Sequence, residues 1–299
     1  MLEHFEISQR REPVVASIPR HEYPTDGAAE DGELLHTAAL QAIDDLEGDS
    51  KVIDQALLLA LTEAECRSVL DPVAGNAPTW RAWVASMQIG SAMFAVATAT
   101  DGGVAARIAG EVRSLTPSGP LRSANAGNWI KAFWLSVICR EQDRMTELCN
   151  VPISVLRGSG AEYDEYIYAW IDALQSYWLN RGNVGEKMVA AVDGTAPESV
   201  EIASRELMLK ILCPPLDLFH RYLRQDHEQF NAALVDAVQW HKEYWTADAD
   251  RASSSEGLVA LGPLAMACLA YDAGYPIEIE SDYLPKALLE SAWVGEIDT

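Results

Sequence analysis

Hydrophobic residues recur along much of this chain at the spacing of an α-helix, while the two-residue alternation of a half-buried strand hardly occurs. The clearest stripe lies in residues 160–179, where acidic residues point away from one strongly aromatic face. A stripe of this kind is stable only when it is buried against other helices. The sequence therefore predicts an all-α fold. The members of the stripe are Tyr163, Tyr166, Ile167, Trp170, Leu174, Tyr177 and Trp178.

Further helices are expected along the chain, each supported by periodicity or by a residue that ends it. A helix that begins near Trp80 should end at the turn Asp101-Gly102-Gly103, and residues 104–114 then form its antiparallel return. The later helices are expected at residues 198–212, 216–223, 230–245, 257–273 and 283–290.

Two segments have a similar form, with a helix, a polar turn and a second helix. They cover residues 132–149 and 218–234, and with one gap Arg140 aligns with Arg224. Such pairs predict a layered array of antiparallel α-hairpins. Because no fixed period relates them, the sequence leaves open whether the array is solenoid-like.

The chain divides into an extended N-terminal arm, residues 1–30, and a single all-helical domain, residues 31–299. The arm is rich in proline and has little periodicity, with a short strand suggested at residues 14–18. The late alternation at residues 276–280 is too short to imply a sheet.

The net charge limits the partners that the protein can bind. Asp and Glu total 45 against 22 Lys and Arg, which gives a formal charge of −23. Such a chain repels nucleic acids and anionic membranes and attracts basic partners, although an acidic surface also serves solubility alone. Five scattered cysteines predict neither a disulfide nor a structural zinc site. With no export signal or membrane span expected, the cytoplasm is the predicted location.

The acidic residues are unevenly distributed. Residues 22–54 contain ten carboxylates and one lysine, whereas in residues 102–157 seven basic residues outnumber four acidic ones. Segregated charge is suited to steering a partner into place. The acids of the aromatic helix, Glu162, Asp164, Glu165 and Asp172, are the first candidates for partner binding, against the alternative of an ordinary solvated face.

No catalytic constellation can be assembled from the sequence. The carboxylates lack the spacing of a diphosphate-binding magnesium site, the histidines lack that of a zinc site, and no phosphate-binding loop or nucleophile motif is present. Glu162, three residues after Ser159, is expected to form a capping box at the start of its helix. We therefore expect no enzymatic activity, no metal and no cofactor.

Several segments resemble the immunity 49 family of bacterial polymorphic-toxin immunity proteins, over roughly residues 20–295. They read RHEYPTDGAAEDGELL, ANAGNWIKAFWLSVICREQDRM, SGAEYDEYIYAWIDALQSYWL, HKEYWTADADR and GLVALGPLAMACLAYDAGYPIEIESDYLPKALLE. The resemblance implies an all-helical cytoplasmic protein that binds and neutralises a cognate toxin domain, frequently a nuclease and hence basic. It carries over no functional residues. A non-catalytic helical scaffold or regulator, and a helical enzyme with an acidic metal site, remain the alternatives.

Overall fold

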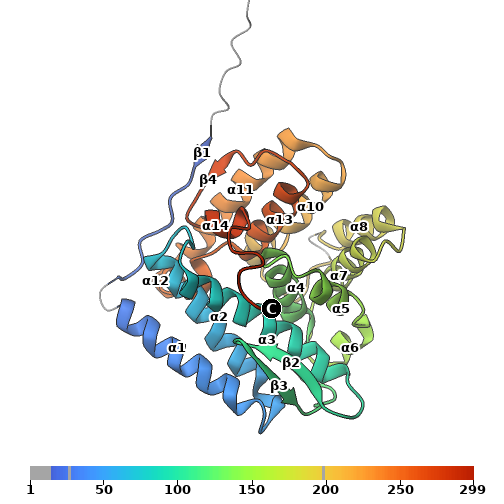
Figure 1. Ribbon diagram of the computed structural model, residues 1–299. Coiled ribbons are helices and arrows are strands. Elements are labelled where there is room, and N and C mark those ends of the chain that lie inside the picture. Colours follow the sequence, from blue (N-terminus) through green and yellow to red (C-terminus); the bar gives the residue numbers. More distant parts are fainter. Residues whose placement is uncertain (1–14, 26–27, 197–198) are drawn as a thin grey trace, which may run out of the picture.

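The computed structural model describes residues 15–25, 28–196 and 199–299, and confirms the all-α fold. The first helices form successive layers, in which α1 packs on α2, α2 on α3 and α3 on α4 (Figure 1). Helix α3 is buried over most of its length, and Trp83, Met87 and Phe94 of the predicted stripe are almost inaccessible. The bounds are α1 Ala28–Asp45, the 3-10 turn η1 Ser50–Val52, α2 Ile53–Leu70, α3 Ala77–Thr98 and α4 Ala126–Ile138.

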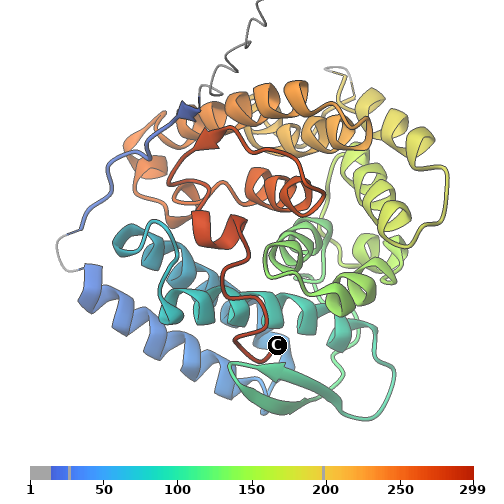
Figure 2. The ribbon, with the colours of Figure 1, turned by 45° about the horizontal axis from the view of Figure 1, so that its top comes forward.

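The remaining helices complete a ring around a central helix, α13, which packs against α4, α10, α11 and α14 (Figure 2). In a solenoid each repeat would contact only its neighbours. Helices α13 and α4 are far apart in the sequence and yet pack together. A solenoid-like arrangement is therefore not confirmed. The bounds are α5 Gln142–Cys149, α6 Ile153–Gly158, α7 Glu165–Trp178, α8 Val184–Asp193, α9 Arg205–Leu207, the π-helix η2 Met208–Leu212, α10 Pro214–Leu223, α11 His227–Trp245, α12 Ala249–Ala252, the 3-10 turn η3 Ser255–Gly257, α13 Leu261–Asp272 and α14 Lys286–Leu289.

The helix predicted at residues 104–114 is wrong. This segment forms an antiparallel β-hairpin, strands β2 (Val104–Ile108) and β3 (Glu111–Leu115), which packs beside α3. Both residues of its tight turn have positive φ, 53° at Ala109 and 86° at Gly110, as a two-residue hairpin turn of the primed type requires. The alternation of buried Ala106 and Ile108 along β2 is short enough to be mistaken for part of a helical stripe.

The two predicted α-hairpins have the same turn geometry. Two residues after the end of each first helix, α4 or α10, the chain has a residue of positive φ, 60° at Arg140 and 56° at Gln225. The next amide then bonds back to a carbonyl in the helix, from Glu141 to Ser136 and from Asp226 to Arg221. The structures therefore align without a gap, and Arg140 corresponds to Gln225 rather than to Arg224.

The described part of the arm pairs with a segment close to the C-terminal end of the sequence. Strand β1 (Ala16–Ser17) pairs in parallel with β4 (Ile279–Glu280), so the late alternation does form a strand, of two residues. Residues 1–14 of the predicted arm lie outside the described residues. Helix α1 begins at Ala28.

Several helix starts differ from the expectation, among them those of α13, which begins at Leu261 rather than residue 257, and α14, which begins at Lys286 rather than residue 283. The aromatic helix begins at Glu165 rather than residue 160. The helix expected at residues 198–212, whose first residue lies outside the described part, begins only at Arg205, after the N-cap Ser204. Among the described residues no helix is both long enough and apolar enough to cross a membrane.

Candidate functional site

The four acids predicted to bind a partner do not share one free face. Asp164 is buried, with 4% of its surface exposed, and its carboxylate accepts hydrogen bonds of 2.7–2.9 Å from the backbone amides of Glu201, Ile202 and Ala203. Although burial of the carboxyl raises its pKa, these three donors outweigh that effect and lower the pKa of Asp164. Asp164 therefore anchors the segment before α9.

The other three acids are exposed to different degrees. The Arg157 guanidinium forms two hydrogen bonds of 2.7 and 2.6 Å with Glu165, and these bonds lower the pKa of that carboxyl. Lys187 of α8 lies 2.7 Å from Asp172. Glu162 is exposed and forms no ion pair among the described residues. The capping box predicted for it is wrong, because α7 begins three residues later and Ser159 Oγ instead accepts from the amide of Ala161.

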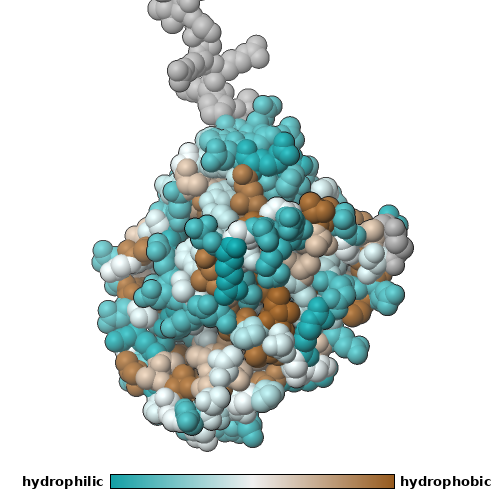
Figure 3. Space-filling model, turned by 90° about the vertical axis from the view of Figure 1, so that its right-hand side faces the viewer, coloured by the Kyte–Doolittle hydropathy of each residue, from teal (hydrophilic) through white to brown (hydrophobic). Residues whose placement is uncertain are grey.

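The side of the molecule formed by α5 to α8 is mostly hydrophilic. Figure 3, which views this side, shows separate hydrophobic spots among hydrophilic residues rather than one continuous apolar patch. Two of the exposed apolar residues on α8 are Val189 and Val192, at 60% and 46% exposure. Isolated apolar residues are normal on a protein surface, so this side gives no independent sign of an interface.

A different surface concentrates unpaired acids. We define the acidic edge as the exposed carboxylates of α1, of the turn that follows it and of the first turn of α2. Helix α1 runs along the outside of the molecule and packs mainly on α2, so its outer face is open (Figures 1 and 2). The acidic edge consists of Glu30, Glu33, Asp44, Asp45, Glu47, Asp49 and Asp54.

Few of these carboxylates are neutralised within the protein. Glu33 lies 3.6 Å from Arg67 and Asp44 lies 2.9 Å from Arg113. The other five form no ion pair among the described residues. Because like charges gathered on one surface reinforce their potential, the acidic edge projects a negative field into solvent.

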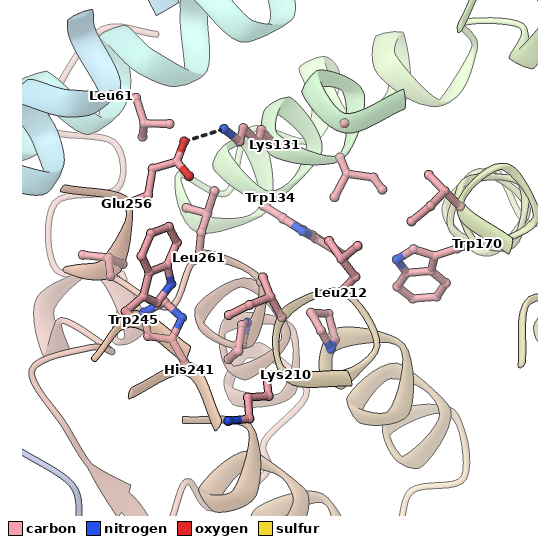
Figure 4. Close-up of a pocket in the computed structure, with 18 of the residues that line it drawn as sticks. Leu61, Lys131, Trp134, Trp170, Lys210, Leu212, His241, Trp245, Glu256 and Leu261 are labelled. Atoms are coloured by element: carbon pink, nitrogen blue, oxygen red, sulfur yellow. Dashed lines mark hydrogen bonds and ion pairs between the residues drawn. The ribbon is translucent and has the colours of Figure 1, made fainter. Parts of the chain in front are cut away.

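A cleft lined by aromatic side chains lies where α4, α7, η2, α11 and the start of α13 meet. Its volume is about 240 Å³. Figure 4 shows Trp134, Trp170 and Trp245 around the cleft, together with Leu212 of the π-helix. A single-turn π-helix is a frequent feature of functional sites. We call this space the aromatic cleft.

The aromatic cleft contains one deeply buried acid. Glu65 of α2 is 5% exposed, and its Oε2 accepts a 2.8 Å hydrogen bond from Ser255 Oγ. Burial raises the pKa of Glu65 to about 7, against the lowering effect of that hydrogen bond. His241 also lines the cleft, and burial lowers its pKa to about 4, so its ring is neutral at pH 7. Its Nε2 lies 3.1 Å from the carbonyl oxygen of Gly257 and so donates to it.

The two lysines of the aromatic cleft already have acidic partners. Lys131 Nζ lies 3.2 Å from Glu256 Oε1, as the dashed line in Figure 4 marks. Lys210 Nζ lies 3.5 Å from both Glu206 and Glu243. Neither lysine forms an ion pair with Glu65. Within the described ranges, no group of three or more His, Cys, Asp and Glu residues is placed to hold a metal ion.

Sequence reasoning missed the aromatic cleft, since its lining residues come from segments up to about 200 positions apart. The only local signal was an acid, Glu65, on the buried side of a helical stripe. The acidic edge, by contrast, follows the charge run already visible at residues 22–54.

A comparison with protein families gives one match. The family model for Immunity protein 49 matches residues 71–288, which is more than half of the chain. No curated protein and no solved structure matches the chain.

Proposed function

Because the chain belongs to the Immunity protein 49 family, we propose that it is a non-enzymatic inhibitor that binds and neutralises a cognate toxin domain in the cytoplasm of the cell that makes it. Family membership supports the general role of an immunity protein. The surface of this chain supports the more specific part of the proposal, which concerns the charge of the toxin.

The acidic edge is the observation that carries this part. Five of its seven carboxylates lack an ion pair among the described residues, so their charge remains available to a partner. A toxin that acts on nucleic acid needs lysines and arginines to hold phosphates. The acidic edge complements such a surface, and complementary potentials accelerate encounter and disfavour wrong partners. A basic toxin domain, with a nuclease as the main candidate class, is therefore the proposed partner.

The acids near α7 have a smaller part in this proposal. Glu162 is kept as a candidate contact, because it is exposed and unpaired within the described structure. Glu165 and Asp172 could contact a partner only in competition with Arg157 and Lys187. Asp164 is assigned to folding.

The test compares two double charge reversals of equal size. Glu30→Lys with Asp45→Lys alters the acidic edge, and Glu228→Lys with Asp236→Lys alters exposed positions on α11, on the opposite side of the molecule (Figure 1). Association with the cognate toxin is measured by surface plasmon resonance from low to high salt, beside protection of toxin-expressing cells. We expect the first variant to associate about 10-fold more slowly at low salt, and the difference to shrink as salt screens the field.

The control variant should associate like the parent. If the two variants lose association rate equally, the effect is one of net charge and the acidic edge is not the interface. If the parent neither binds the toxin nor protects cells, the proposed function is wrong.

A further inference from the structure

Glu65 is a buried acid that forms no ion pair among the described residues, and burial raises its pKa more than the nearby ammonium of Lys131 lowers it. Its Oε2 accepts a hydrogen bond from Ser255, a neutral donor. A carboxylate removed from water without a cation is costly, so such groups are retained mainly where something compensates them. Glu65 lies on the wall of the aromatic cleft, where a ligand could supply the missing charge.

The other charges of the aromatic cleft are compensated. Lys131 is paired with Glu256, and Lys210 lies near two glutamates outside the cleft. His241 is neutral at pH 7, because burial lowers its pKa to about 4. Glu65, which has no ion pair among the described residues, is therefore the group of the cleft whose charged form a cationic ligand would stabilise.

The shape and walls restrict that ligand further. A volume of about 240 Å³ is below the range of about 300–1,000 Å³ that is usual for small-molecule sites, and it suits one long side chain. The walls are mainly aliphatic and aromatic, with three tryptophans among them. Lysine and arginine pack their aliphatic stems on apolar surface while their heads pair with a carboxylate or an aromatic face.

We propose that the aromatic cleft receives one arginine or lysine side chain of the toxin, with its stem between the tryptophans and its cationic head at Glu65. That this side chain belongs to a toxin rests on the proposed function. A wholly apolar side chain would leave Glu65 uncompensated, and a carboxylate would be repelled by it. A buried cationic anchor of this kind is a frequent energetic hot spot of a protein interface.

The position of the aromatic cleft links it to the acidic edge. A second hollow of about 240 Å³ shares Leu61, Glu65, Lys131 and Glu256 with the cleft and extends along α2 to Leu58 and Asp54. Asp54 belongs to the acidic edge. A toxin guided by the acidic edge would therefore meet a groove that leads to Glu65, which favours a protein side chain over a free metabolite as the occupant.

The first experiment uses the whole protein and defined probes. Nα-acetyl-arginine amide is titrated while NMR follows the indole N–H signals of Trp134 and Trp245, assigned by Trp→Phe substitution. The neutral isostere Nα-acetyl-citrulline amide is the matched probe. We expect arginine to shift both signals and citrulline to bind at least about 10-fold more weakly, because it lacks the charge that Glu65 requires. Equal binding of the two probes, or no shift with either, would overturn the proposal.

Two variants test whether Glu65 is the residue that binds the cationic head of the probe. Glu65→Gln preserves the shape of the side chain and should weaken arginine binding at least about 10-fold, whereas Glu228→Gln on α11 should leave it unchanged. Unchanged binding in Glu65→Gln would overturn the assignment of Glu65. Propylguanidine, which has the same cationic head and no peptide group, tests the source, and tighter binding of propylguanidine than of the arginine amide would indicate a small guanidine rather than a toxin side chain.

Binding kinetics with the toxin distinguish a failure of the cleft proposal from a failure of the proposed function. Glu65→Gln should accelerate dissociation of the toxin at least about 10-fold and leave association nearly unchanged, in contrast to the acidic-edge variant. If the parent protects cells and Glu65→Gln binds and releases the toxin at the same rates as the parent, the cleft proposal is wrong and the proposed function stands. A parent that binds the arginine amide but no toxin would overturn the proposed function and the origin of the side chain.

Discussion

The burial of Glu65 predicts that replacing its carboxyl with an amide stabilises the protein, and more so as pH rises. In Glu65→Gln the side chain keeps its shape, and Ser255 Oγ can still donate to the oxygen of the amide. The variant no longer has a charge to bury. The difference in the free energy of unfolding between variant and wild type should therefore depend on pH.

The sign follows from the direction of the pKa shift. Burial raises the pKa of Glu65 from 4.5 to about 7, so the folded state binds its proton more tightly than the unfolded state does. Stability is greatest below pH 4.5 and is lost as pH rises through the pKa of the folded state. One pKa unit corresponds to about 1.4 kcal/mol, so the free energy of unfolding of the wild type falls by about 2–3 kcal/mol relative to the variant between pH 5 and pH 8.

His241 makes the comparison with a variant necessary. Its pKa is lowered to about 4, so it destabilises the fold as pH falls from 6.5 towards 4. In the wild type this effect opposes that of Glu65 over much of the same range, and the net pH dependence conceals both. His241 is present in both proteins, so its contribution cancels in the difference.

The assay is urea unfolding followed by far-UV circular dichroism at pH 5, 6, 7 and 8, with Glu228→Gln as the exposed control. The control should differ from wild type by a small and constant amount, whereas the Glu65→Gln difference should grow by about 2–3 kcal/mol across the series. A difference that stays constant with pH would show that Glu65 is ionised at little cost. The carboxylate of Glu65 would then be compensated within the folded protein.

Two further predictions concern the anchors of the fold. Asp164→Asn should lower the free energy of unfolding by about 1–3 kcal/mol, because it removes the charge of the group that accepts hydrogen bonds from three backbone amides. The control Glu162→Gln should change it by less than about 0.5 kcal/mol, and equal effects of the two variants in thermal unfolding would refute the prediction. Arg140→Ala should cost about 2–4 kcal/mol, because its guanidinium bonds the carbonyls of Leu288 and Leu289 and the carboxylate of Asp272; Arg224→Ala is the control, and a comparable loss there would contradict the assignment.

The fold class was predictable because the helical signal is local. Residues three or four positions apart define a buried stripe, as in α7 and α11, whatever the helix packs against. The same local reasoning failed at residues 104–114, where five residues per strand are too few to separate the two periodicities. It also misplaced the start of α7, because Ser159 and Glu162 do not form the predicted capping box. The helix begins at Glu165, and the carboxylate of its N-cap residue, Asp164, accepts from amides almost 40 positions away.

The sequence by itself determined the helical class, the family resemblance and the excess of negative charge with its concentration in residues 22–54. Each of these is a property of composition or of near neighbours in the chain. The tertiary structure alone decided which acids are free. It buried Asp164, paired Glu165 and Asp172 with basic residues of other segments, and left the acidic edge largely unpaired. It also brought Glu65 to the aromatic cleft. Burial and pairing depend on contacts between residues far apart in sequence, and these are fixed only when the ring of helices closes around α13.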